Sequence, residues 1–121
     1  MAIQSANNHA DKKATVNIAN GIIKGVTPLG IKMGTTPNQQ IEWSIDSSDP
    51  NTNYTFPDNG IEIKPGTDPD AQFTKIGPIA NGKKYQLHDR NSDAISYSYT
   101  VRIMNGTTPL PPLDPTIDNG Q

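Results

Sequence analysis

The chain has 121 residues, of which 32% are hydrophobic and 18% charged, and its formal net charge is −2. This length fits one domain, and the balanced charge excludes the electrostatic footprint needed to bind nucleic acid or an anionic membrane surface. The absence of cysteine excludes disulfide bonds, thiolate metal sites and a cysteine nucleophile, and the 11 prolines argue against long helices.

The N-terminal segment is polar and has no hydrophobic period. We expect residues 1–13, which include His9, to be flexible, and residues 14–121 to form a single domain. The first residues lack the basic and apolar regions of a signal peptide, and no run approaches the ~18 apolar residues of a membrane span. These features predict a cytoplasmic protein with no membrane partner.

The first predicted strands lie close to the start of this domain. Residues 15–18 alternate in hydrophobicity and predict a strand. The pair Asn20-Gly21 separates them from residues 22–26, so the two runs form either a tight hairpin or one long strand with a bulge at the glycine. A further short strand is predicted at residues 29–33.

The strongest strand signal in the first half lies at residues 41–45. Ile41, Trp43 and Ile45 share one face there, because alternate residues of a strand point to the same side. We therefore expect Trp43 in the core.

Turns punctuate the middle of the chain. Residues 54–56 and 61–63 flank a four-residue turn and predict a hairpin, and short strands are predicted at residues 73–76 and 85–87. Asn-Gly pairs, which favour tight hairpin turns, begin at residues 20, 59, 81, 105 and 119. Because no window has a helical period, the sequence predicts an all-β chain of seven or eight strands.

The clearest alternation lies at residues 95–104. The apolar face consists of Ile95, Tyr97, Tyr99, Val101 and Ile103, and the opposite face consists of Ser96, Ser98, Thr100, Arg102 and Met104. We expect a central strand about 30 Å long, whose apolar face is buried with Trp43. The tail, residues 105–121, carries four prolines and is predicted to be extended or in turns.

Two local features resemble immunoglobulin-like domains. Trp43 lies on the inward face of an early strand, and Asp93 precedes Tyr97 by four residues, as at the tyrosine corner where strand F begins. Tyr99 stands where an antibody domain has a cysteine. The resemblance implies an antiparallel Greek-key β-sandwich.

The C-terminal half also resembles a small bacterial family, DP-EP, named for its Asp-Pro and Glu-Pro dipeptides. Residues 97–101 and 113–119 carry this resemblance. It brings no established activity to this chain, so it bears on the fold more than on the function.

Candidate catalytic groups are few. His88, next to Asp89 and close to Asp93, would suit a general base oriented by a carboxylate. The alternative is an ordinary surface histidine. Because no serine lies in a nucleophile-elbow context, we favour that alternative and expect neither a catalytic residue nor enzymatic activity.

Aspartates gather in the predicted loops, where calcium is often bound. They are Asp46, Asp49, Asp58, Asp68, Asp70, Asp89 and Asp93. Their spacing does not match an EF-hand loop, and aspartate also favours turns because it hydrogen-bonds to nearby backbone. We therefore expect no metal site and no cofactor.

These observations predict a non-enzymatic binding or structural module that acts through protein contacts. One alternative is a carbohydrate- or small-ligand-binding module, in which aromatic side chains form a stacking platform. Another is a hydrolase whose site consists of loop carboxylates. The aromatics of the alternating strands are better explained as core, because they share faces with isoleucine and valine.

A possible interaction face lies on the polar side of the strand at residues 95–104. Ser96, Ser98 and Thr100 are uncharged, and Arg102 is the one charged residue of that side. Little desolvation is needed to bring such a face against another surface, and hydroxyl groups can hydrogen-bond across strands. An ordinary solvated sheet face is the alternative. We predict a weak homodimer or an unknown protein partner at this face.

Overall fold

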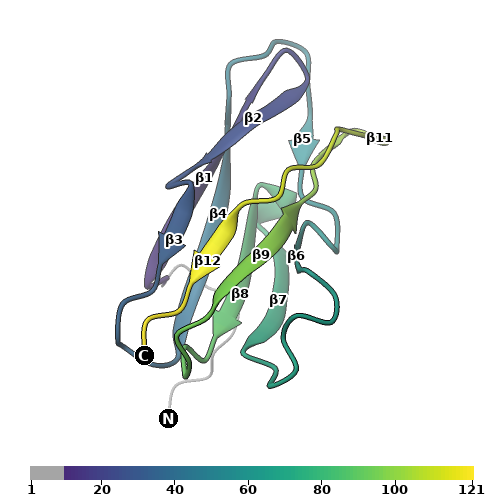
Figure 1. The fold of residues 1–121 in the computed structure, drawn as a ribbon. Helices are drawn as coiled ribbons and strands as arrows, with labels where there is room; N and C mark the ends of the chain where they lie inside the picture. Colours follow the sequence, from purple (N-terminus) through teal and green to yellow (C-terminus); the bar gives the residue numbers. More distant parts are fainter. Residues whose placement is uncertain (1–9) are drawn as a thin grey trace.

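Alternating apolar residues give each long strand one buried face, and in the computed structural model, which describes residues 10–121, two sheets pack these faces together (Figure 1). The strands are β1 (Lys12–Ala19), β2 (Ile22–Thr27), β3 (Gly30–Lys32), β4 (Gln39–Ser47), β5 (Tyr54–Thr55), β6 (Ile61–Ile63), β7 (Phe73–Ile79), β8 (Lys84–Asp89), β9 (Ser96–Val101), β10 (Met104–Asn105), β11 (Thr108–Pro109) and β12 (Thr116–Asp118). One short 3-10 turn, η1, covers Ala80–Gly82.

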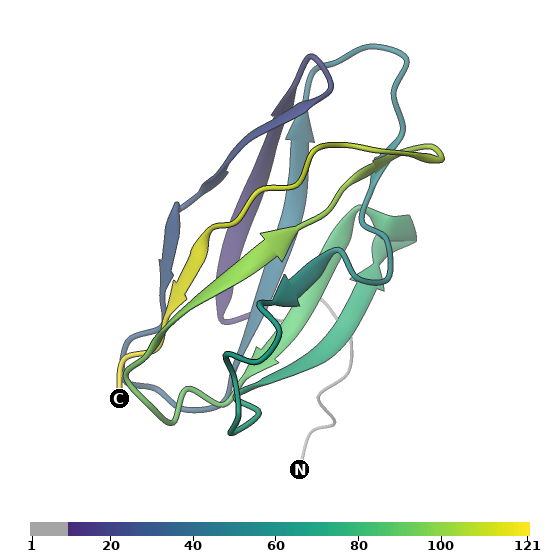
Figure 2. The ribbon, with the colours of Figure 1, turned by 45° about the vertical axis from the view of Figure 1, so that its right-hand side comes forward.

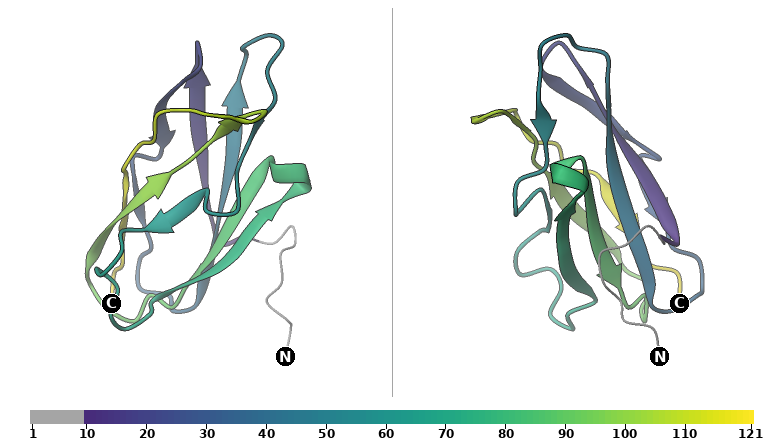
Figure 3. Two further views of the ribbon diagram at one scale, coloured as in Figure 1. Left: turned by 90° about the vertical axis from the view of Figure 1, so that its right-hand side faces the viewer. Right: turned by 180° about the vertical axis from the view of Figure 1, so that it is seen from behind.

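The strands form one five-stranded, one four-stranded and one three-stranded sheet. The five-stranded sheet has the order β2-β1-β4-β8-β7, and the four-stranded sheet has the order β3-β12-β9-β6. The small sheet β11-β10-β5 lies at one end, and the β10–β11 hairpin extends away from the two large sheets there (Figure 3).

The chain is nearly all β, as predicted, but its sheets are mixed rather than antiparallel. β1 runs parallel to β4, and β3 runs parallel to β12, whereas the remaining strand pairs are antiparallel. The described residues form twelve strands instead of seven or eight, because several have only two or three residues. Apolar and polar residues alternate with the same period in parallel and in antiparallel sheets. The sequence pattern of a strand therefore does not reveal the direction of its neighbour.

The first two strands form a hairpin. β1 and β2 turn at Asn20-Gly21, where both residues have positive φ (54° and 71°), as the predicted tight turn requires. A register shift lies between Asn17 and Ile18 rather than at the glycine. β1 begins at Lys12, two residues before the predicted domain start. His9 lies outside the described residues.

The core contains the predicted aromatic and aliphatic side chains. Trp43, Tyr97, Tyr99, Val101 and Ile103 are all buried, which confirms the prediction. The ring centroids of Trp43 and Tyr99 lie 5.4 Å apart in an edge-to-face arrangement, and the Trp43 Nε1–H group donates a hydrogen bond to the Tyr99 hydroxyl (3.1 Å). Tyr97 packs against Phe73 at 5.0 Å.

The segment 95–104 and the tail differ from expectation. Ile95 is 52% exposed because it precedes the first paired residue of β9. The expected long strand ends at Val101, where the Arg102 amide turns to donate to the Gly60 carbonyl (2.7 Å), and Met104 enters the small sheet. The tail is not wholly irregular, since β12 lies between β3 and β9.

Candidate functional site

The predicted interaction face lies on the outer side of the four-stranded sheet. Ser96 and Ser98 are exposed, and Thr100 and Arg102 are half-buried. Most of these side chains have partners on neighbouring segments. The Ser96 hydroxyl donates to Asp118, the Thr100 hydroxyl donates to Asp114 (2.9 Å), and the Arg102 guanidinium donates to Glu62 (2.9 Å).

Neighbouring segments also bring charge to this face. Its cations are Lys32, Lys64 and Arg102, and its anions are Glu62, Asp114 and Asp118. Lys32 pairs with Asp118 at 3.0 Å, and Arg102 pairs with Glu62 at 2.9 Å. The face is therefore more highly charged than β9 alone suggests, although its positive and negative charges are equal in number.

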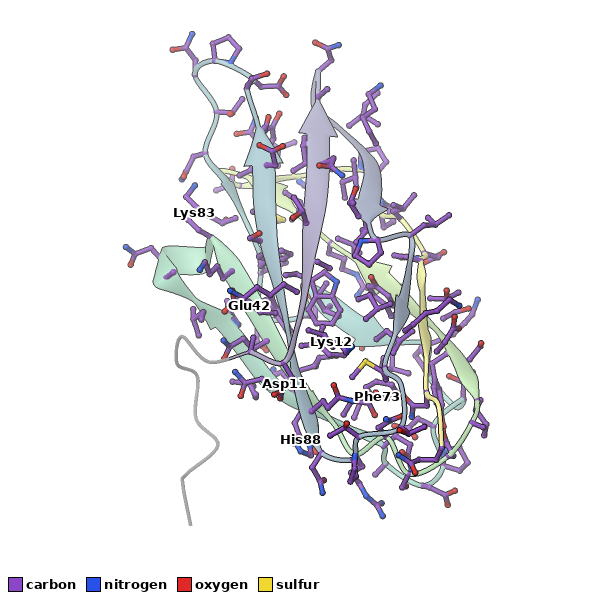
Figure 4. All side chains as sticks on the ribbon, turned by 90° about the vertical axis from the view of Figure 1, so that its left-hand side faces the viewer. Asp11, Lys12, Glu42, Phe73, Lys83 and His88 are labelled. Carbon is purple, nitrogen blue, oxygen red and sulfur yellow. The ribbon has the colours of Figure 1, made fainter. Side chains whose placement is uncertain are left out.

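The two halves of the proposed histidine–carboxylate pair lie on opposite faces of β8. His88 points outward (Figure 4). A shallow hollow beside it is lined by Thr74, Lys75 and Ile76. Asp89 points inward and is fully buried. Because adjacent strand residues face opposite sides, Asp89 does not orient His88 for base catalysis.

Asp89 belongs to a buried polar cluster at the C-terminal end of the sandwich. Its Oδ1 atom accepts a hydrogen bond from the Asn91 amide (2.8 Å), but among residues 10–121 its buried Oδ2 atom has no hydrogen-bond partner. Burial raises the pKa of the Asp89 carboxyl to about 6, and the nearby carboxylates Asp93 and Asp68 act in the same direction. The buried side chain of Asn119 contacts this carboxyl group, and its Oδ1 atom also lacks a partner among the described residues.

The rest of this cluster has a structural role. The Asn91 side chain donates to the carbonyls of Gly34 (2.9 Å) and Thr36 (2.8 Å) and accepts from the Gly120 amide (2.9 Å). A β-carbon at residue 120 would overlap the Gly34 carbonyl, so only glycine fits this contact. The Tyr97 hydroxyl donates to the Asp93 carboxylate, which fixes the start of β9.

The loop aspartates also hold the chain's own turns. Asp49 accepts hydrogen bonds from the Tyr54 hydroxyl (2.7 Å) and from the backbone amides of Asn20 (2.9 Å) and Gly21 (3.1 Å), and the bond from Tyr54 is the main reason why its pKa is lowered. Asp68 likewise accepts from two backbone amides. Within residues 10–121, no three side chains of His, Cys, Asp or Glu are placed to hold one metal ion.

The aromatic side chains do not form a stacking platform. Trp43, Tyr54, Phe56, Tyr85, Tyr97 and Tyr99 are buried, and Phe73 is half-buried between the sheets. The chain has no other aromatic residue, since its full count is one tryptophan, four tyrosines and two phenylalanines. The structure therefore lacks the exposed rings that sugar stacking needs.

A groove lies where the two large sheets meet at one open margin. There β6, the edge of the four-stranded sheet, lies beside β7, the edge of the five-stranded sheet (Figure 2). The groove has a volume of about 430 Å³. Its lining consists of Asp58, Asn59, Ile61, Glu62, Ile63, Asp68, Phe73, Lys75, Tyr85 and Leu87.

The groove has an apolar floor and a charged rim. Ile61, Tyr85 and Leu87 are buried in the floor, while Ile63 and Phe73 are half-buried along its sides. The Tyr85 hydroxyl donates to the Asp58 carbonyl (2.7 Å), and burial raises the pKa of Tyr85 to about 12.

Lys75 connects the two margins of the groove. It pairs in register with the buried Leu87, so its side chain points toward the inner side of the sheet. Its Nζ atom lies 2.6 Å from Asp58 Oδ2, across the groove. An inward-pointing charge on an edge strand discourages another strand from adding there. The bulge between Lys75 and Gly77 has the same effect.

This groove was not predicted from the sequence, because its lining comes from four separate segments. A possible signal was the pair Phe73 and Lys75, which places an aromatic and a charged side chain on the same face of a short strand. No protein-family model matches the chain, and no curated protein matches its sequence. Within residues 10–121, no helix has the length and apolar character needed to cross a membrane.

Proposed function

We propose that the protein is a non-enzymatic binding module of the immunoglobulin-like β-sandwich type, and that it binds an extended segment of a partner protein in the groove between β6 and β7. The single observation that carries this proposal is the groove itself, which joins an apolar floor to a charged rim. Protein contacts commonly have this organisation of an apolar centre within a polar rim.

The strand order supports the immunoglobulin-like assignment. β4-β8-β7 and β12-β9-β6 correspond to the two facing halves of such a sandwich, and β3 joins the edge of the second half. β1, inserted between β2 and β4, is an addition to this pattern. The hydrogen bond from Tyr97 to Asp93 at the start of β9 also resembles the tyrosine corner of immunoglobulin-like domains.

The contacts of the groove carboxylates favour binding over catalysis. A hydrolase needs a carboxyl group that can exchange a proton with its substrate. Asp58 is paired with Lys75, Glu62 is paired with Arg102, and Asp68 accepts two backbone amides. The groove lining contains no histidine, serine, threonine or cysteine.

The shape of the groove favours an extended polypeptide. The groove follows the whole length of β6, with Asp58 before the strand and Asp68 after it. Alternate side chains of an extended chain point to one side and would enter the groove at successive positions. The ligand is held mainly by its side chains, because Lys75 and the adjacent bulge oppose strand addition at β7.

Panning a random peptide library against the immobilised protein tests this function. We expect enriched peptides to shift the backbone amide resonances of residues 61–63 and 73–75. Ile63→Lys should weaken their binding, whereas the same substitution at the exposed Ile22 should not. If no peptide is enriched, or if the shifts map to another surface, the proposed function is wrong.

The charges on the outer face of the four-stranded sheet favour a second kind of protein contact, self-association. The outer face of the four-stranded sheet carries equal numbers of positive and negative side chains, while the whole chain has a net charge of −2. Two copies can therefore meet through this face with less repulsion than elsewhere, and we propose that they form a weak homodimer there.

A further inference from the structure

We infer that the groove recognises a lysine or arginine side chain of the partner segment, which takes the place of Lys75 at the carboxylate of Asp58. This inference rests on the proposed function and adds the chemistry of the partner. It follows from three features: the charge of the groove rim, the exposure of the Lys75–Asp58 ion pair, and the apolar lining of the groove.

The charge of the groove favours a cationic ligand. Asp58, Glu62 and Asp68 contribute three negative charges to its lining, and Lys75 together with Arg102, which pairs with Glu62, offsets two of them, which leaves an excess of one negative charge. Opposite charge in a partner speeds association and selects against acidic competitors.

The ion pair across the groove can open easily. The side chain of Asp58 is 83% exposed and that of Lys75 is 50% exposed. An ion pair in contact with water contributes little to stability, because solvent and side-chain entropy offset the attraction. A cation from the partner can therefore replace Lys75 at Asp58 at little cost, and Lys75 can then extend into solvent.

The apolar surface of the groove suits the stem of a long basic side chain. Lysine and arginine place an aliphatic stem along apolar surface while the charged end remains hydrated. Ile63 and Phe73 line this groove and are only half-buried, so they can cover such a stem. Because alternate residues of an extended chain face the same side, an apolar residue two positions from the basic one completes the contact.

The peptides enriched from the random library test this inference directly. We expect them to share a lysine or arginine two positions from an apolar residue. In synthetic versions, replacing that basic residue by norleucine should weaken binding about threefold or more, and added salt should reduce the affinity of the original peptide.

Matched variants of the protein test the role of the ion pair. Asp58→Asn should weaken binding about threefold or more, because it removes the carboxylate that receives the cation. Asp46→Asn changes the net charge equally at an exposed position outside the groove and should have little effect. Lys75→Ala should strengthen binding because it removes the internal competitor, whereas Lys24→Ala on the exposed edge strand β2 should not.

The outcomes separate this inference from the proposed function. If the enriched peptides shift groove resonances but lack a basic residue, or bind Asp58→Asn and wild type equally, the inference is overturned and the proposed function stands. If acetyl-lysine amide binds as tightly as the peptides, the groove is a small-cation site and the polypeptide assignment is overturned. If no peptide binds in the groove, both proposals fail.

Discussion

Burial governs the protonation of Asp89, whose carboxyl group lies at the C-terminal end of the sandwich. Asp89 Oδ2 and Asn119 Oδ1 both lack a hydrogen-bond partner among residues 10–121, and the two side chains are in contact. Burial disfavours the ionised carboxylate, while the contacts with the Asn91 amide and the Asn119 side chain act in the opposite direction and only partly offset it. The buried carboxyl therefore favours its neutral form.

We predict that Asp89 makes the folded protein less stable as the pH rises from about 4 to 6. Its pKa is about 6 in the folded protein and 3.8 in the reference state, so the folded protein holds this proton more tightly than the unfolded chain does. The stabilisation is fully present below the unfolded pKa and is lost as the pH passes the folded pKa, with a total on the order of 2–3 kcal/mol.

Urea unfolding at pH 4 to 7 measures this effect. Asp89→Asn keeps the shape of the neutral acid and has no ionisable group, so it should be more stable than wild type at pH 7 and should lack this part of the pH dependence. The difference in unfolding free energy between wild type and variant at each pH isolates the effect of Asp89, because the other carboxyl groups contribute equally to both proteins. A variant less stable than wild type at pH 7 would show that the fold needs the ionised carboxylate.

The buried contact between Trp43 and Tyr99 gives a second residue-level prediction. Trp43→Ala should reduce the free energy of unfolding by about 3–5 kcal/mol, because it leaves a large cavity at the centre of the core. Tyr99→Phe should cost about 1–3 kcal/mol, because it leaves the buried indole N–H without its acceptor. Chemical denaturation measures both values, and an unchanged midpoint for Trp43→Ala would contradict the described core.

At the scale of elements, the long alternating strands were predictable and the order of the sheets was not. Residues 41–45 and 96–101 reveal their buried faces because apolar residues recur at every second position. The segment 116–118 contains one apolar residue, Ile117, and follows several prolines, so it has no visible period. Its place between β3 and β9 depends on partners that lie far away in the sequence.

The same reason explains why the groove was not predicted. β6 and β7 belong to different sheets, and their proximity follows from sheet packing rather than from any local pattern. The polar side of β9 was identified correctly as exposed at Ser96 and Ser98, but its ion pairs come from neighbouring segments such as β12 and β3.

Removing residues 116–121 should abolish cooperative unfolding. This deletion removes β12, the shared neighbour of β3 and β9, and leaves two strand edges and the site of the buried Ile117 open to water. Ile117→Val serves as the mild control and should cost about 0.5–1.5 kcal/mol while keeping a sharp transition. A sharp thermal transition in the truncated protein, followed by circular dichroism, would contradict the central role of β12.

At the scale of the whole molecule, most sheet edges are protected. β7 carries the inward Lys75 and a bulge, and β3 and β6 have only three residues each. Association through added strands is therefore disfavoured, and contacts between molecules should use faces and grooves instead.

We accordingly expect a weak homodimer that forms through the outer face of the four-stranded sheet. Sedimentation equilibrium should show association at hundreds of micromolar protein, and Ser98→Lys at the centre of that face should abolish it. Thr15→Lys, on the other large sheet, is the matched control. A wild-type protein that stays monomeric across this concentration range would eliminate the homodimer and leave the groove as the proposed contact site.

The position of β12 also has a consequence for synthesis on the ribosome. β3 and β9 precede β12 in the chain, so they leave the ribosome before the strand that joins them. Until residues 116–118 emerge, the four-stranded sheet stays divided, and the pocket for Ile117 is exposed to other nascent chains. Strand edges in this state invite aggregation, so chaperones should be needed most during this interval.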